Sequence, residues 1–155
     1  MMAIDYYNAG MNAYAGGRYT EAYEWLIQGA NDPRCDYALG VLFYNGQGVE
    51  RNFRRATEHY SRAADAGIVP AQVSAGFAYA NALGVPEDFE KAAHYLRMAA
   101  TSGEPAAKIT LAEIYAKGHA GGSRKEAAAL IRDVLRTGSS EEAMDIYSRY
   151  ELHKA

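Results

Sequence analysis

Residues 39–49 read LGVLFYNGQGV, an apolar run that contains one glycine and closes with two more. A glycine inside a helix costs about 1 kcal/mol relative to alanine, so Gly40 needs an explanation. Gly46 and Gly48 suit a turn, because glycine adopts positive φ without strain. We therefore expect a helix that ends at Gly46 and leaves a gap at Gly40, into which a neighbouring helix packs.

The same pattern recurs along the chain at a nearly constant spacing. A shift of 36 residues carries Gly40 to Gly76, and a shift of 35 residues carries Ala92 to Ala127. A small residue occupies one shared position of the first helix in each of four units: Gly10, Gly40, Gly76 and Ala112. Internal repetition of this kind is typical of helical arrays, in which each unit buries its apolar face against the next.

Each unit has the features of two helices joined by a short turn. Residues that can begin the second helix are Arg18, Asn52, Asp88 and Ser123, of which the last three are good N-caps. Residues that can stop it are Pro33, Gly67, Gly103 and Gly138. The sequence predicts an all-α fold, a right-handed α/α superhelical solenoid of about four helix-turn-helix repeats over residues 3–33, 34–69, 70–105 and 106–138. A capping helix over residues 139–153, begun by a capping box of Ser139 and Glu142, is expected to close it.

Composition limits the classes of function. The chain has 155 residues, is 49% hydrophobic and 23% charged, and carries a formal net charge of −3, so it offers no basic field for nucleic acid. Its single cysteine excludes an intrachain disulfide. The first twenty residues lack the apolar core of a signal peptide, and no window approaches the roughly 20 apolar residues of a membrane span. We expect a cytoplasmic protein without membrane insertion.

The segment LGVLFYNGQGV…RRATEHYSRAADAG resembles the Sel-one-like repeat family, whose members are related to tetratricopeptide repeats. Residues 39–67 match that pattern nearly throughout, residues 75–103 match well, and residues 111–138 match in part because the Gly-Val pair is lost. The first unit lacks the longer loop and is more similar to a tetratricopeptide repeat. The resemblance implies a scaffold or adaptor that binds proteins. Secreted members carry paired cysteines, so their absence favours an intracellular setting.

In arrays of this kind the first helices line the concave side. Counted from the small-residue position, the inward-facing positions lie on one stripe of each first helix, followed by a polar column. The predicted partner-binding residues are Tyr7, Met11, Tyr14, Tyr37, Val41, Tyr44, Asn45, Phe77, Asn81, Glu113 and Lys117. Tyrosine-rich surfaces are common at interfaces, and an extended peptide or a helix would fit such a trough. Two alternatives stay open: the rings pack between adjacent first helices, and the asparagines merely end their helices.

The sequence contains no recognisable constellation of catalytic residues. The four histidines, His59, His94, His119 and His153, fall on positions with no common face, and Cys35 has no partner cysteine for a metal. We expect no catalytic residue, metal or cofactor. The favoured interpretation is a non-enzymatic module that binds a protein or peptide on its concave face, as a monomer or homodimer. Alternatives are an inhibitor or immunity-type protein that blocks one enzyme, self-association into a homo-oligomer and, least favoured, an enzyme.

Overall fold

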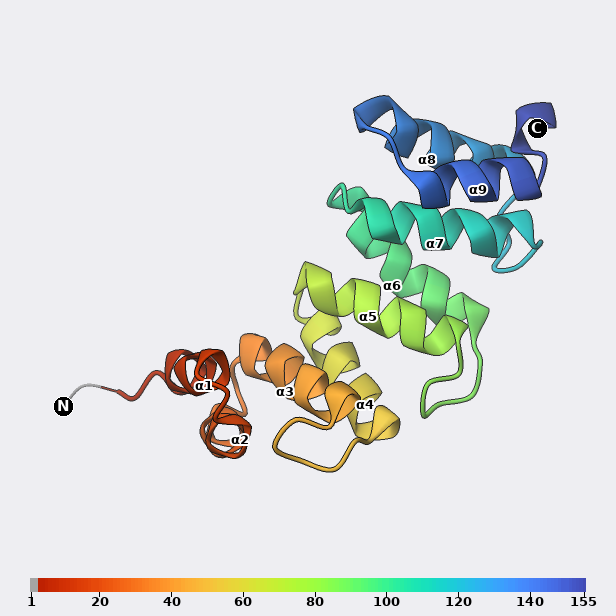
Figure 1. The fold of residues 1–155 in the computed structure, drawn as a ribbon. Helices are drawn as coiled ribbons and strands as arrows, with labels where there is room; N and C mark the ends of the chain where they lie inside the picture. Colours follow the sequence, from red (N-terminus) through yellow and green to blue (C-terminus); the bar gives the residue numbers. More distant parts are fainter. Residues whose placement is uncertain (1–2) are drawn as a thin grey trace.

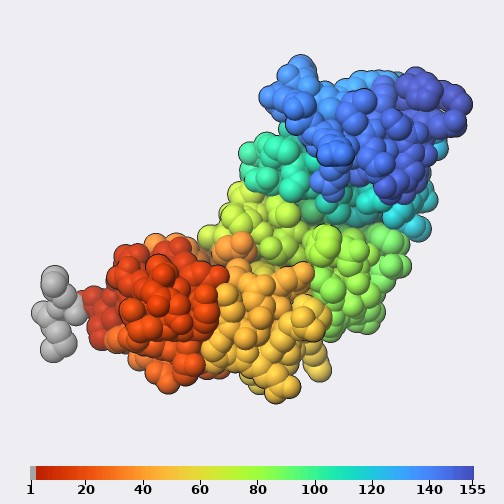
Figure 2. All heavy atoms as spheres, in the orientation of Figure 1, coloured from red at the N-terminus to blue at the C-terminus, as the bar shows by residue number. Residues whose placement is uncertain are grey.

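The computed structural model describes residues 3–155, which form nine α-helices, a final 3₁₀ turn and no β-strand. Consecutive helices pair as hairpins that follow one another from one end of the molecule to the other (Figures 1 and 2). This arrangement confirms the expected α/α solenoid. The helices are α1 (Tyr6–Ala15), α2 (Tyr19–Gln28), α3 (Pro33–Asn45), α4 (Phe53–Asp65), α5 (Val69–Ala80), α6 (Phe89–Thr101), α7 (Pro105–Ala116), α8 (Arg124–Thr137) and α9 (Glu141–Arg149), and the 3₁₀ turn is η1 (Leu152–Lys154).

The glycine inside three of the first helices, α1, α3 and α5, accommodates a side chain of the second helix. A Cβ atom placed on Gly40 would lie 2.5 Å from a ring carbon of Tyr60, far inside van der Waals contact. The equivalent Gly10 and Gly76 face Leu26 and Leu96 at 2.6 and 2.5 Å. The gap expected from the sequence is therefore confirmed, and it sets how closely the two helices of a hairpin approach.

Three second helices begin at the predicted N-caps. The side chains of Asn52, Asp88 and Ser123 each accept a hydrogen bond from the backbone N–H three residues later, at 2.9–3.1 Å. Arg18 occupies the same position but makes no such bond, because its side chain has no acceptor to offer.

Two predicted helix ends are wrong by a few residues. Pro33 begins α3 instead of ending α2, which stops before Gly29. Proline has no N–H to lose in the first turn of a helix, so it suits that place. The last helix is capped by Ser140 and not by Ser139. Gly138 is fully extended (φ 170°, ψ 177°), and the chain turns into helix α9 only after Ser140.

The first helices form one side of the array. In Figure 1, α3, α5, α7 and α9 lie in front of α4, α6 and α8. Direct contacts between adjacent first helices join α1 to α3 and α5 to α7, and α7 also contacts α9. We call the side made by α1, α3, α5, α7 and α9 the first-helix face.

The C-terminal end of the array is closed by η1. Leu152 is completely buried there against the last core cluster. Arg124 donates hydrogen bonds to the carbonyl oxygens of Tyr150 and Glu151 and so ties the turn to the start of α8. Among the helices of residues 3–155, none has the length and apolar character needed to cross a membrane.

Candidate partner-binding face

Two grooves lie on the first-helix face. The smaller one, the tyrosine groove, encloses about 220 Å³ between α1 and α3. The larger one, the central groove, encloses about 360 Å³ and crosses α3, α5, α7 and α9. The tyrosine groove is lined by Tyr7, Met11, Tyr14, Tyr37, Ala38 and Val41. The central groove is lined by Tyr44, Thr57, Tyr60, Val73, Ser74, Phe77, Ala78, Leu83, Ala106, Thr110 and Glu142.

The tyrosine groove gathers five of the residues expected from the sequence. Tyr7, Met11 and Tyr14 follow one another at the i, i+4 and i+7 positions of α1, so they share one stripe of the helix. The Tyr14 hydroxyl donates to Gln47 Oε1 at 3.3 Å. All three side chains are half-buried, which leaves part of each ring or thioether open to a ligand.

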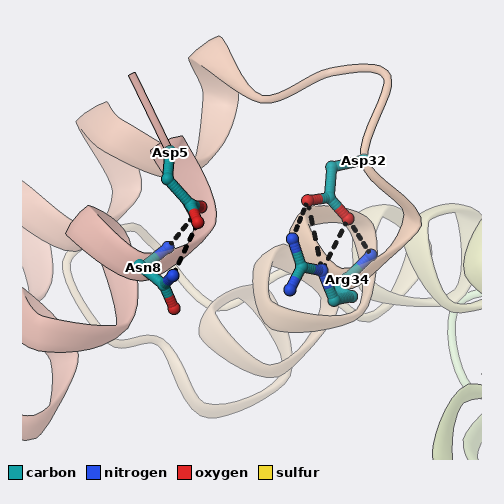
Figure 3. Close-up of polar contacts among 4 residues, drawn as sticks. All are labelled: Asp5, Asn8, Asp32 and Arg34. Atoms are coloured by element: carbon teal, nitrogen blue, oxygen red, sulfur yellow. Dashed lines mark hydrogen bonds and ion pairs between the residues drawn. The ribbon is translucent and has the colours of Figure 1, made fainter. Parts of the chain in front are cut away.

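Asp5 and Asp32 cap the starts of α1 and α3, the two helices that form this groove (Figure 3). The Asp5 carboxylate accepts hydrogen bonds from the backbone N–H and the side-chain amide of Asn8, at 3.0 and 2.6 Å, and so begins α1. Asp32 begins α3 in the same way through the N–H of Arg34 and also binds its guanidinium group, and these hydrogen bonds lower the pKa of Asp32. The guanidinium carbon of Arg34 lies 4.3 Å from the ring centroid of Tyr7. This stacking covers one side of the ring.

Three aromatic rings line the central groove, and two of them are exposed. Tyr44 and Phe77 are 37% and 45% exposed, respectively. Tyr60 belongs to the second helix α4, but the gap at Gly40 lets its ring reach the groove, where it lies 5.8 Å from the ring of Tyr37. Burial raises the pKa of Tyr60 well above its usual value, and the neighbouring Tyr37 adds to that effect. The Tyr60 hydroxyl therefore keeps its proton at neutral pH.

The four polar residues of the predicted site line neither groove. The side-chain amides of Asn45 and Asn81 donate to Gln47 Oε1 at 3.3 Å and to the Phe77 carbonyl at 2.9 Å, close to the ends of their own helices. For these two residues the structure favours the alternative that they end a helix.

Glu113 and Lys117 are engaged by the end of the chain. Glu113 accepts a hydrogen bond from the Tyr150 hydroxyl at 3.3 Å and lies 3.4 and 3.5 Å from the side-chain nitrogens of Lys117 and Arg149. Tyr150 and Arg149 come from the end of α9, which packs on α7. The polar groups of Glu113 and Lys117 are therefore engaged within the protein.

Of the residues that line the central groove, the predicted site included only Tyr44 and Phe77. Tyr60 and Glu142 are the most informative of those it missed. Tyr60 stands in the second-helix column that otherwise holds Leu26, Leu96 and Ile131. It is the one aromatic residue of that column. Because a tyrosine is longer than a leucine or an isoleucine, this difference could have indicated that its ring extends to the first-helix face. Glu142 was assigned only to a capping box, and no local pattern indicates that α9 brings it to α5 and α7.

The remaining ionisable groups do not gather at either groove. His59 Nδ1 lies 2.9 Å from Asp36 Oδ1, and the His59 ring stacks on Phe43 with centroids 5.6 Å apart. Arg62 lies 3.5 Å from the same Asp36 oxygen, so this buried carboxylate is partnered, as a buried charge requires. Within residues 3–155, no three His, Cys, Asp or Glu side chains are grouped closely enough to hold a metal ion.

A comparison with protein-family models matches the description "Sel1 repeat" at residues 3–32, 33–68 and 69–104. The chain belongs to the Sel1 repeat family. Such repeats generally mediate protein–protein interaction. The match includes the first unit, in spite of its shorter loop, and it leaves out the fourth hairpin, where the Gly-Val pair is lost.

Solved structures share the fold of this Sel1 repeat protein. A Sel1 repeat protein from Oxalobacter formigenes is 25% identical, with a TM-score of 0.79 over 93% of this chain and 59% of that chain. A protective antigen present in uropathogenic Escherichia coli strains, described as displaying an SLR fold, is 21% identical, with a TM-score of 0.80 over 97% of this chain and 38% of that one. The chain thus spans less than two thirds of either. Among curated proteins, none matches the sequence.

Proposed function

We propose that this protein is a non-enzymatic interaction module whose first-helix face binds a segment of a partner protein. One observation carries the proposal: Tyr44 and Phe77 present exposed rings in a groove that crosses successive first helices. Exposed aromatic rings that line a concave surface offer contact area at a low cost in side-chain entropy, and such rings dominate binding energy at interfaces. Membership of the Sel1 repeat family supports a protein as the partner.

The arrangement of the two grooves favours an extended or helical segment over a folded surface. Tyr37 and Val41 line the tyrosine groove, and Tyr44 lines the central groove, although all three lie on one stripe of α3. A segment that follows this stripe would place side chains in both grooves. Peptide recognition of this kind uses pockets for alternate side chains along a shared groove.

The chemistry of the described residues supports binding without catalysis. None of the four histidines lines either groove, and the thiol of Cys35 is buried away from them. A catalytic site requires a nucleophile or a base within hydrogen-bond reach of a bound substrate. The grooves offer aromatic rings, aliphatic side chains, hydroxyl groups and a single carboxylate, Glu142, which has no second acidic or basic side chain beside it in the lining formed by residues 3–155.

The proposal can be tested with a random library of twelve-residue peptides displayed on phage. We expect peptides selected on the wild-type protein to bind Tyr44→Ala and Phe77→Ala at least tenfold more weakly, because each substitution removes an exposed ring from the groove. Ile27→Ala is the matched control, since Ile27 is 45% exposed but belongs to α2. Fluorescence anisotropy measures the affinities, and circular dichroism checks that each variant stays helical.

Two results would count against this function. Peptides that bind equally well to the wild type and to both groove variants must occupy another surface. If the affinity of the selected peptides falls with Ile27→Ala, the peptides bind to the side made by the second helices and not to the groove. Sedimentation velocity of the free protein adds a separate check, because a copy of the chain seated in the groove would compete with every peptide.

A further inference from the structure

The central groove holds a single charged side chain. Glu142 lines it among residues that are apolar or carry a neutral hydroxyl group. Glu142 lies in the first turn of α9 and is exposed. Within residues 3–155, no Lys, Arg or His nitrogen lies within 4.0 Å of its carboxylate. The groove therefore carries one negative charge that the chain itself does not neutralise.

Two nearby acidic residues, Asp145 and Glu113, differ from Glu142 because basic side chains of the protein pair with them. Asp145, one turn further along α9, forms an ion pair with Arg149. Glu113 of α7 lies within ion-pair distance of Arg149 and Lys117. Glu141 shares the first turn of α9 with Glu142 and likewise has no basic nitrogen within 4.0 Å among residues 3–155, but it does not line the groove. Glu141 thus experiences the same helix dipole without the groove, which makes it a matched control.

The rings of the groove are also free of the protein's own cations. Elsewhere in residues 3–155, arginine or lysine groups lie over aromatic rings, as Arg34 does over Tyr7 and Lys91 over Tyr79. None of these cations lies over Tyr44, Tyr60 or Phe77. Aromatic faces attract cations, and aliphatic stems of basic side chains pack well on apolar walls while the charged group stays at the rim.

We propose that the central groove takes a lysine or arginine side chain of the partner segment, with its stem against Tyr44 and Phe77 and its charge at Glu142. This inference rests on the proposed function and adds the chemistry of the side chain that the groove selects. Charge complementarity decides the choice: an acidic side chain would meet the Glu142 carboxylate, and a purely apolar one would leave it without a partner.

Two small probes that differ only in the ammonium group test the inference on the full-length protein. One is lysine with an acetyl group at its N-terminus and a methylamide at its C-terminus, and the other is norleucine capped in the same way. Titrations are followed by the ¹⁵N–¹H amide signals of Phe77, Thr110 and Glu142. We expect the lysine probe to bind at least threefold more tightly than the norleucine probe. Glu142→Gln should abolish that difference, and Glu141→Gln should preserve it.

The possible results separate this inference from the function on which it rests. Equal affinity of the two probes, or a preference for lysine that survives Glu142→Gln, would overturn the cation assignment. If neither probe shifts these signals, the assignment also fails. Should phage-selected peptides without any basic residue still depend on Phe77, the interaction module would stand and only the choice of side chain would be wrong. If Glu142→Gln is poorly folded, the affinities of the two probes for the wild type are compared in 20 and 300 mM salt. A preference for lysine that comes from charge must weaken at high salt, and an unchanged preference would overturn the cation assignment.

Discussion

At the scale of single residues, Gly40 sets the distance between α3 and α4. The Tyr60 ring fills the space that a Cβ atom would need, at 2.5 Å from its ideal position. Alanine would gain about 1 kcal/mol of helix propensity at this position. Overpacking of a closely packed contact costs about 1–3 kcal/mol, so the steric effect outweighs that gain.

We therefore predict that Gly40→Ala lowers the free energy of unfolding by about 1–2 kcal/mol. Chemical denaturation followed by circular dichroism measures it. Gly138→Ala is the control: nothing lies within 4 Å of its ideal Cβ, and its extended backbone suits any residue. A Gly40→Ala protein as stable as the control would mean that Tyr60 moves aside without cost.

Cys35 provides a second prediction at this scale. Its side chain is 1% exposed, and burial raises the pKa of its thiol to about 11. The thiolate is the reactive form, so the native protein at pH 8 should react with a disulfide reagent about a hundredfold more slowly than a free thiol. The rate should reach the free-thiol value in urea. Fast labelling of the folded protein would contradict the buried position.

The same shift makes stability depend on pH. Between pH 9 and 11 the folded protein keeps the thiol proton while the unfolded chain loses it, because the pKa is about 11 in the folded state and 9.0 without burial. Unfolding is therefore favoured as pH rises through this window. We expect the free energy of unfolding of the wild type to fall more steeply there than that of Cys35→Ala, which lacks the thiol but keeps every other titrating group. Parallel curves would show that the thiol contributes nothing.

At the scale of elements, local caps fix where the helices begin. Asp88 accepts the N–H of Lys91 at 2.9 Å at the start of α6. Removal of such a cap costs about 0.5–2 kcal/mol. We predict a loss of about 1 kcal/mol for Asp88→Ala and little loss for Asp88→Asn, which keeps a side-chain oxygen. Thermal denaturation compares the two. An equal loss in both variants would indicate that the charge matters more than the hydrogen bond.

Helices and caps were predictable because their causes are local. The glycine gap, the N-caps and the spacing of about 36 residues depend on neighbours within one unit, and so does the placement of Tyr7, Met11 and Tyr14 on one stripe. The two helix ends that were predicted wrongly are those at Pro33 and Ser139. At each of them, several neighbouring residues could begin or end a helix, and the local sequence does not decide between them.

The parts of the site that could not be predicted depend on distant segments. Glu113 lies on α7, and the end of α9 engages it through Tyr150 and Arg149. Glu142 joins the central groove for the same reason. No repeat column contains this information, because α9 occurs once. Tyr60 belongs to the second helix α4, and its reach to the first-helix face depends on how closely two helices approach.

At the scale of the whole molecule, stability should be distributed along the array and not shared by one core. Each hairpin contacts mainly its neighbours, which is the behaviour of solenoids. Leu152 closes the C-terminal end and is completely buried. Truncation of a buried leucine costs about 2–5 kcal/mol, and here the loss should remain near that end.

We predict that Leu152→Ala speeds amide hydrogen exchange in α8 and α9 while α1 to α4 keep their protection. Exchange read by mass spectrometry resolves the two regions. His153→Ala, a change at the exposed neighbouring residue, should alter neither region. Uniform loss of protection along the chain would mean that the array unfolds as a single cooperative unit.

Tyr60 packs against Gly40 in the place where the first and third units have a leucine, and this difference has a consequence for how a partner could bind along the array. A strictly periodic surface would let a bound chain slide from one unit to the next at no cost. Tyr60 makes one site along the length unlike the rest, so a partner segment that recognises this ring would bind at one position only. One departure from the repeat pattern can thus determine where on a repetitive scaffold a partner binds.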